Sequence, residues 1–266
     1  PVTHWVWGGG ILSSWGTMDF AGGIVVHATA GTAALVTALT LGKRRGFPKS
    51  ITPPHSPILT MIGASMLWIG WFGFNAGSAL GANGGAGMAM LVTHISAATA
   101  SLVWMFIEWK RFGKPSLIGI VTGMVAGLAT VTPASGYIGV PGGLILGFLG
   151  GLLCYLAVDY IRGKLQIDDS LDVFAVHGVG GIIGTLLVAF LATSTFSGLG
   201  LAEGQTGTSQ FIIQLKAVVL TVIWTSFFTY LILKLTSLIV SLRVDEQEEI
   251  EGLDLRSHGE KGYHSD

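Results

Sequence analysis

The run VPGGLILGFLGGLLCYLAV, residues 140 to 158, contains no charged residue. A helix needs about 20 mostly apolar residues to cross the hydrocarbon core of a bilayer. The run therefore predicts a membrane-spanning helix inside an apolar stretch from about 137 to 161. Glycine recurs there at every fourth position, at Gly139, Gly143, Gly147 and Gly151. Because small residues let helices approach closely in lipid, this spacing predicts tight helix packing.

The rest of the chain has the same character. Of its 266 residues, 50% are hydrophobic, 40 are glycine and only 11% are charged. Typical soluble domains carry about 25% charged residues, so a soluble fold is excluded. Six further apolar stretches lie at about 19–42, 57–82, 86–109, 115–134, 171–194 and 211–242. We therefore predict an all-α fold, a polytopic membrane helix bundle with seven transmembrane helices.

Basic residues alternate between the predicted loops. Three loops hold them: Lys43, Arg44, Arg45 and Lys49, then Lys110, Arg111 and Lys114, then Arg162 and Lys164. The intervening loops contain no lysine or arginine. Since cytoplasmic loops collect these residues, the N-terminus of the chain is expected outside and the C-terminus inside. Residues 1–242 form the predicted transmembrane domain, and residues 243–266 form a polar cytoplasmic tail that we expect to be ordered against the basic inner loops.

Several classes of function are not supported by the composition. The formal net charge of -1 gives no footprint for nucleic acid, and Cys154, the single cysteine, allows no disulfide framework or cysteine-based metal site. No metal or other cofactor is expected. The chain opens Pro-Val-Thr-His with no signal peptide, and we expect it to begin inside a longer protein.

Three histidines fall inside predicted spans, His27, His94 and His177. Ionisable residues at membrane depth are costly, and each is a hypothesis for a functional site. His27 lies about 12 Å along its helix, close to the bilayer midplane. Glycine follows His27 and His177 four positions later, at Gly31 and Gly181, so a neighbouring helix can approach each imidazole. A neutral imidazole bonded to a nearby carbonyl is the structural alternative, and it remains the interpretation of His94.

The helices that carry His27 and His177 are the first and sixth of the seven, so they cross the bilayer in opposite directions. Equivalent helices of an inverted five-helix repeat are arranged in this way, with the site near the midplane. In such a repeat, the first helix here would close a half whose other four helices are absent.

The outer ends of the helices suggest a cation site. Trp71, Phe72 and Phe74 lie in the outer half of the second span beside Asn75 and Ser78, where aromatic faces and a hydroxyl suit a small cation. Asp19 opens the first span, where it can cap the helix or attract a cation, and the spacing does not separate these roles. Trp7 fits an aromatic belt at the membrane interface.

Several motifs together resemble the ammonium transporter (Amt/Mep/Rh) family, and the bacterial branch most. They cover essentially the whole chain: Trp7-Gly-Gly-Gly10, Asp19-Phe-Ala-Gly-Gly23 with His27, Gly70-Trp-Phe-Gly-Phe-Asn-Ala-Gly-Ser78, Val131-Thr-Pro-Ala-Ser-Gly-Tyr137, Asp168-Asp169 through Asp172-Val-Phe-Ala-Val-His-Gly178, and Glu251-Gly-Leu-Asp254 with His258-Gly259.

The resemblance implies roles for individual residues. Trp7 and Ser78 would bind ammonium at an outer site, with Phe74 as an aromatic gate. His27 and His177 would be twin pore histidines that share a hydrogen bond and assist proton relay. Asp19 would be needed structurally near the outer site, and Trp71 would line the pore. His94 has no place in the family's substrate path.

The resemblance also implies an assembly and a place in the cell. The family fold has eleven transmembrane helices and forms a homotrimer with one pore in each subunit. This chain matches helices five to eleven and the tail, so it lacks a second gate phenylalanine and another aromatic of the outer site. The expected setting is the cell (inner) membrane as a multi-pass protein, with a PII-type signal protein as the cytoplasmic partner.

The predicted function is a transporter or channel, not an enzyme. Ammonium would lose a proton near the outer gate, pass the histidines as ammonia and regain a proton inside. The choice between ammonium and methylammonium is left open. One alternative is an ammonium sensor on the same fold. Another is a seven-helix receptor or photoreceptor, with Lys216 or Lys234 holding a chromophore, although no carboxylate lies at depth on the second or third span as a counter-ion.

Overall fold

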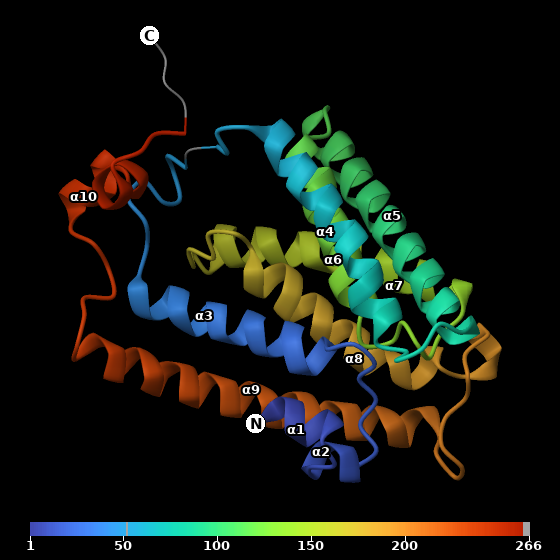
Figure 1. Ribbon diagram of the computed structural model, residues 1–266. Helices are drawn as coiled ribbons and strands as arrows, with labels where there is room; N and C mark the ends of the chain where they lie inside the picture. Colours follow the sequence, from blue (N-terminus) through green and yellow to red (C-terminus); the bar gives the residue numbers. More distant parts are fainter. Residues whose placement is uncertain (52, 263–266) are drawn as a thin grey trace.

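The computed structural model describes residues 1–51 and 53–262, and within them it is helical, with no strand (Figure 1). Turns η1, η2, η3 and η5 are π-helical and η4 is a 3₁₀ turn. The elements in chain order are α1 (Val2–Trp7), α2 (Ile11–Ser14), η1 (Gly23–Ala28), α3 (Thr29–Leu41), α4 (Pro57–Gly77), α5 (Gly84–Phe112), α6 (Leu117–Val131), α7 (Val140–Asp159), η2 (Tyr160–Lys164), η3 (Phe174–Gly178), α8 (Val179–Leu191), η4 (Ser194–Phe196), α9 (Gly207–Ser237), α10 (Glu246–Glu251) and η5 (Asp254–His258).

Each of the seven predicted spans is present as a helix. Six are long and apolar enough to cross a membrane, namely Gly23–Leu41, Pro57–Gly77, Gly84–Phe112, Val140–Lys164, Phe174–Leu191 and Gly207–Ser237. The predicted span 115–134 is shorter than expected, because α6 has only 15 residues. Pro133 lies two residues after the last residue of α6, and a proline has no backbone N–H to continue the helical hydrogen bonds. The chain is a multi-pass membrane helix bundle.

The helix starts follow local capping chemistry. Ser56 precedes Pro57 at the first position of α4, and its hydroxyl accepts from the backbone N–H of Leu59. Such a side chain satisfies one of the donors that a helix N-terminus leaves free. The same arrangement begins α5 at Asn83, α6 at Ser116 and α9 at Thr206.

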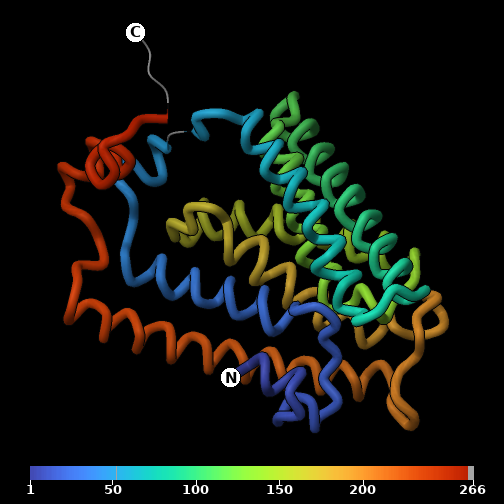
Figure 2. Tube along the Cα trace, viewed as in Figure 1, coloured from blue at the N-terminus to red at the C-terminus, as the bar shows by residue number. Residues whose placement is uncertain are grey.

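The helices form two sides that meet at α6 and α8. On one side α9 runs along α3, as Figure 2 also shows, with α1 and α2 beside α9. On the other side α5 packs against α4, α6 and α7. Helix α8 contacts α6, α7 and α9, so it connects the two sides.

The repeating glycines lie where helices meet, which confirms the predicted packing role. Those of α6 and α7 that face α5 are Gly119, Gly123, Gly127, Gly143, Gly147 and Gly151. A Cβ at Gly147 would lie 2.6 Å from the carbonyl oxygen of Ser96, and one at Gly151 would lie 2.9 Å from that of Ala100. Real Cβ atoms do not come so close, so these backbones approach only because the side chain is missing.

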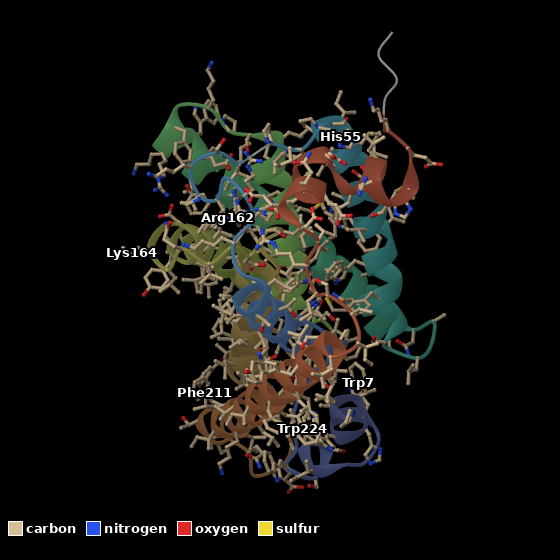
Figure 3. The ribbon with its side chains drawn as sticks, turned by 90° about the vertical axis from the view of Figure 1, so that its left-hand side faces the viewer. Trp7, His55, Arg162, Lys164, Phe211 and Trp224 are labelled. Atoms are coloured by element: carbon tan, nitrogen blue, oxygen red, sulfur yellow. The ribbon has the colours of Figure 1, made fainter. Side chains whose placement is uncertain are left out.

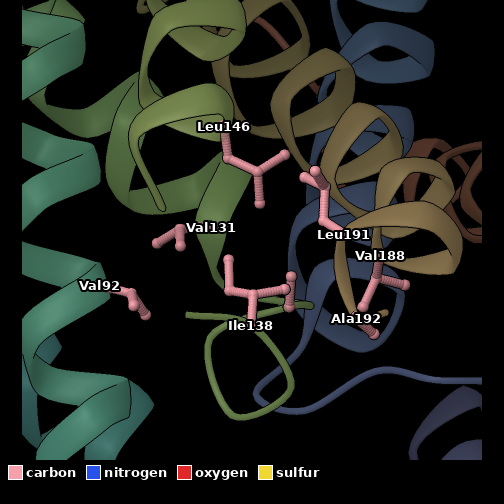
Figure 4. Close-up of a cluster of buried hydrophobic side chains, with 8 residues drawn as sticks. Val92, Val131, Ile138, Leu146, Val188, Leu191 and Ala192 are labelled. Carbon is pink, nitrogen blue, oxygen red and sulfur yellow. The ribbon is translucent and has the colours of Figure 1, made fainter. Parts of the chain in front are cut away.

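A buried apolar cluster holds α5, α6, α7 and α8 together near the turn after α6 (Figure 4). Its buried members are Val92, Val131, Ala134, Ile138, Leu146, Val188, Leu191 and Ala192. In lipid such contacts stabilise by close packing, since the surrounding acyl chains are equally apolar. This cluster fixes the loop that follows α6, which contributes to the site described below.

Gly31 offers a test of the close approach between the helices that carry the two histidines. A Cβ there would meet the backbone of Gly178. We expect Gly31→Ala to lower stability by about 1 to 3 kcal/mol, the usual cost of overpacking, and to lower the melting temperature in detergent. Gly73→Ala on α4 is the matched control, because a Cβ at Gly73 meets nothing within 4 Å. Equal melting temperatures for the two variants would contradict the packing described.

The described part of the tail packs against the loop after α3, as expected. The Arg45 N–H donates to Glu249 Oε1 at 2.8 Å, and the Arg243 guanidinium meets Glu249 at 2.7 Å. Arg243 also donates to the carbonyl of Leu41. The Arg45 N–H and the Arg243 charge hold the pKa of Glu249 below its usual value. The last tail residues, 263–266, lie outside the described residues.

Candidate functional site

The structure brings His27 and His177 together, although 150 positions separate them in sequence. His27 lies in η1 and His177 in η3, and the two Nδ1 atoms are 3.2 Å apart. The ring centroids are 5.2 Å apart with 29° between the planes. One Nδ1 must carry the proton and the other must accept it, so the pair shares one hydrogen bond. Each ring then keeps its Nε2 for another partner.

A cavity of about 710 Å³ contains both imidazoles. Apart from these two histidines and the indole of Trp71, its lining side chains are apolar. They come from η1, α3, α4 and the residue before η3, and include Val26, Ala30, Met66, Leu67, Phe74 and Val173. His27 is 2% exposed, and its Nε2 has no hydrogen-bond partner among the described residues. The cavity therefore presents very few polar groups to whatever enters it.

Aromatic rings from α4 cover the pair. Trp71 stacks on His27, with centroids 5.4 Å apart and 15° between the planes, and lies nearly parallel to His177 at 6.4 Å. Phe74, almost one turn further along α4, lies 6.0 Å from His27. Of the three aromatic residues predicted in the second span, Trp71 and Phe74 line the histidine cavity, whereas Phe72 lies against His94.

Two aspartates hold the turns that carry the histidines. The Asp19 carboxylate accepts from the backbone N–H groups of Gly22, Gly23, Ile24 and Val25. The Asp169 carboxylate accepts in the same way from those of Val173, Phe174 and Ala175. These groups would otherwise be free donors at a helix start. Each turn is π-helical, a form common at functional sites.

Asp169 was not recognised from the sequence as a residue of the site. The signal was present, because Asp19 precedes His27 by eight positions and Asp169 precedes His177 by the same eight. Two antiparallel helices with the same cap-to-histidine spacing are what an inverted repeat would produce.

The contacts of Asp19 favour capping over cation attraction. Its side chain is 3% exposed, and both of its oxygens accept backbone hydrogen bonds. Because four backbone N–H groups already donate to its two oxygens, the carboxylate has few lone pairs left to bind a cation. The two alternatives that the sequence left open are thus separated by burial.

Trp7 and Ser78 are predicted to form an outer site, and Figure 3 labels Trp7 in the half of the molecule away from His55. The Trp7 indole donates to the Asp19 carbonyl at 2.8 Å, and its side chain is 48% exposed. The Ser78 hydroxyl donates to the Phe74 carbonyl at 2.8 Å and is exposed. Among the described residues, no hydrogen bond or ring contact joins Trp7 to Phe74 or Ser78.

His94 lies apart from the cavity. Its ring is exposed on α5 and contacts Trp68 at 5.2 Å and Phe72 at 6.2 Å. Among the described residues, no hydrogen bond or ring contact joins His94 to His27 or His177. Within residues 1–51 and 53–262, no three His, Cys, Asp or Glu side chains gather as a metal site.

Charged residues cluster in the linker before η3, at the end that Figure 3 marks with Arg162 and Lys164. Arg44 forms a two-point ion pair with Asp168, with contacts of 2.8 and 2.9 Å. Despite the opposing effect of burial, Arg44 holds the pKa of Asp168 below its usual value. Arg162 meets Asp172 at 2.7 Å. These pairs tie the basic loops to the turn that carries His177.

Asp172 gives a pH dependence that can be measured. Burial raises its pKa to about 6, against the opposing charge of Arg162. The folded state therefore holds the Asp172 proton more tightly than the unfolded state does. The protonated carboxyl stabilises the fold at low pH, and this contribution to the free energy of unfolding is lost as pH rises toward 6. We expect the melting temperature of the natural protein to fall relative to that of Asp172→Asn as pH rises from about 4.5 to 7. A difference that is constant with pH would contradict this.

Comparison with known proteins identifies relatives across the chain. The model of the Ammonium Transporter Family matches residues 1–263. The ammonium transporter Amt1 of Archaeoglobus fulgidus is 48% identical over 99% of this chain, and an ammonium transporter of Aquifex aeolicus is 46% identical over the same share. The chain spans 66% and 61% of their lengths, less than two thirds of each.

Solved structures agree with these sequences. A protein described as a sensor Amt protein is 32% identical with a TM-score of 0.88, and 97% of this chain aligns with 66% of it. Mep2 of Candida albicans is 36% identical with a TM-score of 0.84, and 93% of this chain aligns with 57% of it. The family match, the identities and the shared helical fold all concern the same residues, and this chain belongs to the ammonium transporter family.

Proposed function

We propose that this chain forms the pore-lining part of an ammonium transporter, which binds ammonium at its outer end and conducts ammonia past His27 and His177. The observation that carries the proposal is the pair of hydrogen-bonded imidazoles inside an otherwise apolar cavity. Such a lining accepts a small neutral molecule with N–H groups and rejects an intact ion.

Selection against potassium follows from the chemistry of the two ions. They have similar size and the same charge, so a cation site alone separates them poorly. An apolar cavity imposes a large desolvation cost on any ion. Ammonium can avoid this cost by losing a proton, and potassium cannot. Ammonia can then donate a hydrogen bond to an imidazole nitrogen such as the Nε2 of His27, which has no partner within the described part of the chain.

The proposed outer site uses Trp7, Phe74 and Ser78. The Ser78 hydroxyl gives its proton to the Phe74 carbonyl, so its oxygen lone pairs face a donor from outside. An ammonium ion carries four such donors. The Trp7 N–H is bonded to Asp19, which leaves the indole ring to offer its face to a cation. Ammonium would rest on these aromatic rings while it donates to Ser78.

In this mechanism the substrate passes Phe74 first and the histidine pair second. Ammonium loses a proton near Phe74, ammonia moves along the cavity, and a proton is regained at the inner end. The shared Nδ1 hydrogen bond lets the pair exchange its proton between the rings, so the histidines can assist the relay. Asp19 acts by holding η1, and Trp71 by covering the pair.

The remaining assignments extend this proposal. Residues 1–242 form the transmembrane domain in the cell (inner) membrane, with the N-terminus of the chain outside. Residues 243–266 form the cytoplasmic tail. The protein acts as a homotrimer and not as an enzyme, and a PII-type signal protein binds its inner face. The bond between the tail residue Glu249 and the loop residue Arg45 supports a tail that transmits changes to that face.

Transport is favoured over sensing. Curated relatives named ammonium transporters are 48% and 46% identical, whereas the solved structure described as a sensor is 32% identical. A receptor or photoreceptor with a lysine-bound chromophore has no support from these relatives. Methylammonium remains an alternative substrate to be compared directly with ammonium.

Reconstitution of the full-length natural protein in liposomes tests the proposal. An inward ammonium gradient should produce uptake, a potassium gradient should not, and methylammonium forms a third arm. Ser78→Ala should raise the ammonium concentration for half-maximal uptake about tenfold, because a hydrogen bond to a charged group contributes about 1.5–3 kcal/mol. Ser65→Ala is the matched control, since Ser65 bonds the Met61 carbonyl on the same helix at the same 2.8 Å. Absence of uptake by the natural protein refutes the proposal.

A further inference from the structure

A chain of buried polar side chains begins at the indole N–H of Trp71. The Trp71 indole N–H donates to the Thr132 hydroxyl at 2.9 Å. Thr132 Oγ1 lies 2.7 Å from the Leu128 carbonyl oxygen and 3.2 Å from Asn75 Oδ1. The Asn75 amide in turn donates to Thr93 Oγ1 at 2.9 Å. Asn75, Thr93 and Thr132 are all fully buried.

This chain joins three helices at one indole. Trp71 and Asn75 lie one turn apart on α4, Thr93 lies on α5, and Thr132 follows the last residue of α6. Thr132 precedes Pro133, where α6 ends, so the end of that helix fixes the position of the hydroxyl. The acceptor for the indole is therefore the first residue after α6, and its hydroxyl is bonded back to the Leu128 carbonyl of that helix.

The result for Trp71 is a fixed orientation. Its N–H points to Thr132, while its ring face stacks on His27 at 5.4 Å and lies nearly parallel to His177. Without the Thr132 hydroxyl, a buried indole N–H has no partner, which is costly in an apolar surrounding. It would then turn toward the imidazoles or toward water, and either change disturbs the shared Nδ1 hydrogen bond.

We infer that Thr132 is a positioning residue, which holds the Trp71 indole flat against the histidine pair and keeps its N–H out of the cavity. Asn75 supports the position of Thr132, because its Oδ1 lies 3.2 Å from the same hydroxyl oxygen. This inference rests on the proposed function for its effect on transport, but the position of the indole can be measured separately.

The experiment compares Thr132→Val with Thr132→Ser in the full-length natural protein in liposomes. Valine keeps the shape and removes the hydroxyl, whereas serine keeps the hydroxyl. We expect Thr132→Val to lower ammonium uptake roughly tenfold or more, as small misplacements at a reacting centre do, and to admit a potassium leak. Thr132→Ser should stay within about twofold of the natural protein, since its hydroxyl can still accept the indole N–H.

A spectroscopic readout follows the indole itself. With ¹⁵N in the tryptophan side chains, the Trp71 signal is assigned by its loss in Trp71→Phe. We expect this signal to move in Thr132→Val and to stay in Thr132→Ser. An unmoved signal in Thr132→Val overturns the inference. If the natural protein takes up no ammonium, the proposed function fails, while the movement of this signal still decides whether Thr132 positions the indole.

A double-mutant cycle guards against a general folding defect. In a Trp71→Phe background the indole N–H is already absent, so adding Thr132→Val should reduce uptake no further. An additional tenfold loss in that background would show that Thr132 acts on something other than Trp71, and it would overturn the inference.

Discussion

Replacing both histidines of the cavity, His27→Ala together with His177→Ala, is expected to reduce selective ammonium uptake by roughly a hundredfold or more, the usual contribution of positioned proton-transfer groups. The two imidazoles are the principal polar groups of the cavity, and their Nδ1 atoms are 3.2 Å apart. Alanine at both positions leaves an apolar passage with no acceptor for an ammonia N–H and no path for a shared proton. Liposome uptake with ammonium and potassium gradients measures both rate and selectivity.

His94→Ala is the matched control for that experiment. It also removes an imidazole from a membrane-spanning helix, but His94 lies on the exposed side of α5 against Trp68 and Phe72. Its uptake should stay within about twofold of the natural protein, the scale of a surface substitution. A double alanine variant with unaltered rate and selectivity would remove the histidine pair from the mechanism.

Asp19→Ala is expected to have the largest effect on folding. The substitution removes the acceptor of four successive backbone N–H groups, and the carboxylate that it deletes is 3% exposed. Each buried donor left without a partner costs about 1–3 kcal/mol. Since whole domains are stable by only about 5–15 kcal/mol, we expect little folded protein. Asp19→Asn keeps one acceptor oxygen and should be intermediate in yield and melting temperature.

Asp245→Ala provides the comparison for Asp19. Asp245 also caps a helix, accepting from the Glu248 N–H at 2.8 Å, but this helix is exposed in the tail. Loss of an exposed cap costs about 1 kcal/mol. Yields and melting temperatures that fall equally in the two variants would show that the buried Asp19 network carries no special weight.

Much of the fold is predictable from composition and local chemistry. Apolar length predicts the spans, because backbone groups in lipid must bond within their own helix. Repeated glycines such as Gly147 predict close packing, and the structure places that residue against Ser96. The predicted span 115–134 extends three residues past the observed end of α6 at Val131. The apolar stretch continues into the turn, whereas Pro133 lacks the backbone N–H that would extend the helix.

The site was predictable only in part. His27 and His177 stand out because ionisable residues are rare at membrane depth. Their partners do not stand out, since a threonine or asparagine in an apolar run is ordinary. Thr132 has no local feature that marks it as the acceptor for the Trp71 indole, because the two residues are 61 positions apart.

The sequence by itself determined the apolar helices, because these depend on apolar length along one chain. It also predicts the orientation of the chain and the depth of each histidine from the distribution of charge. Only the tertiary structure decided which side chains meet. The Nδ1 contact of His27 and His177, the stacking of Trp71 on His27 and the Thr132 hydroxyl behind it depend on how helices rotate and cross. Rotation is set by contacts between distant residues such as Gly31 and Gly178, and no local pattern contains that information.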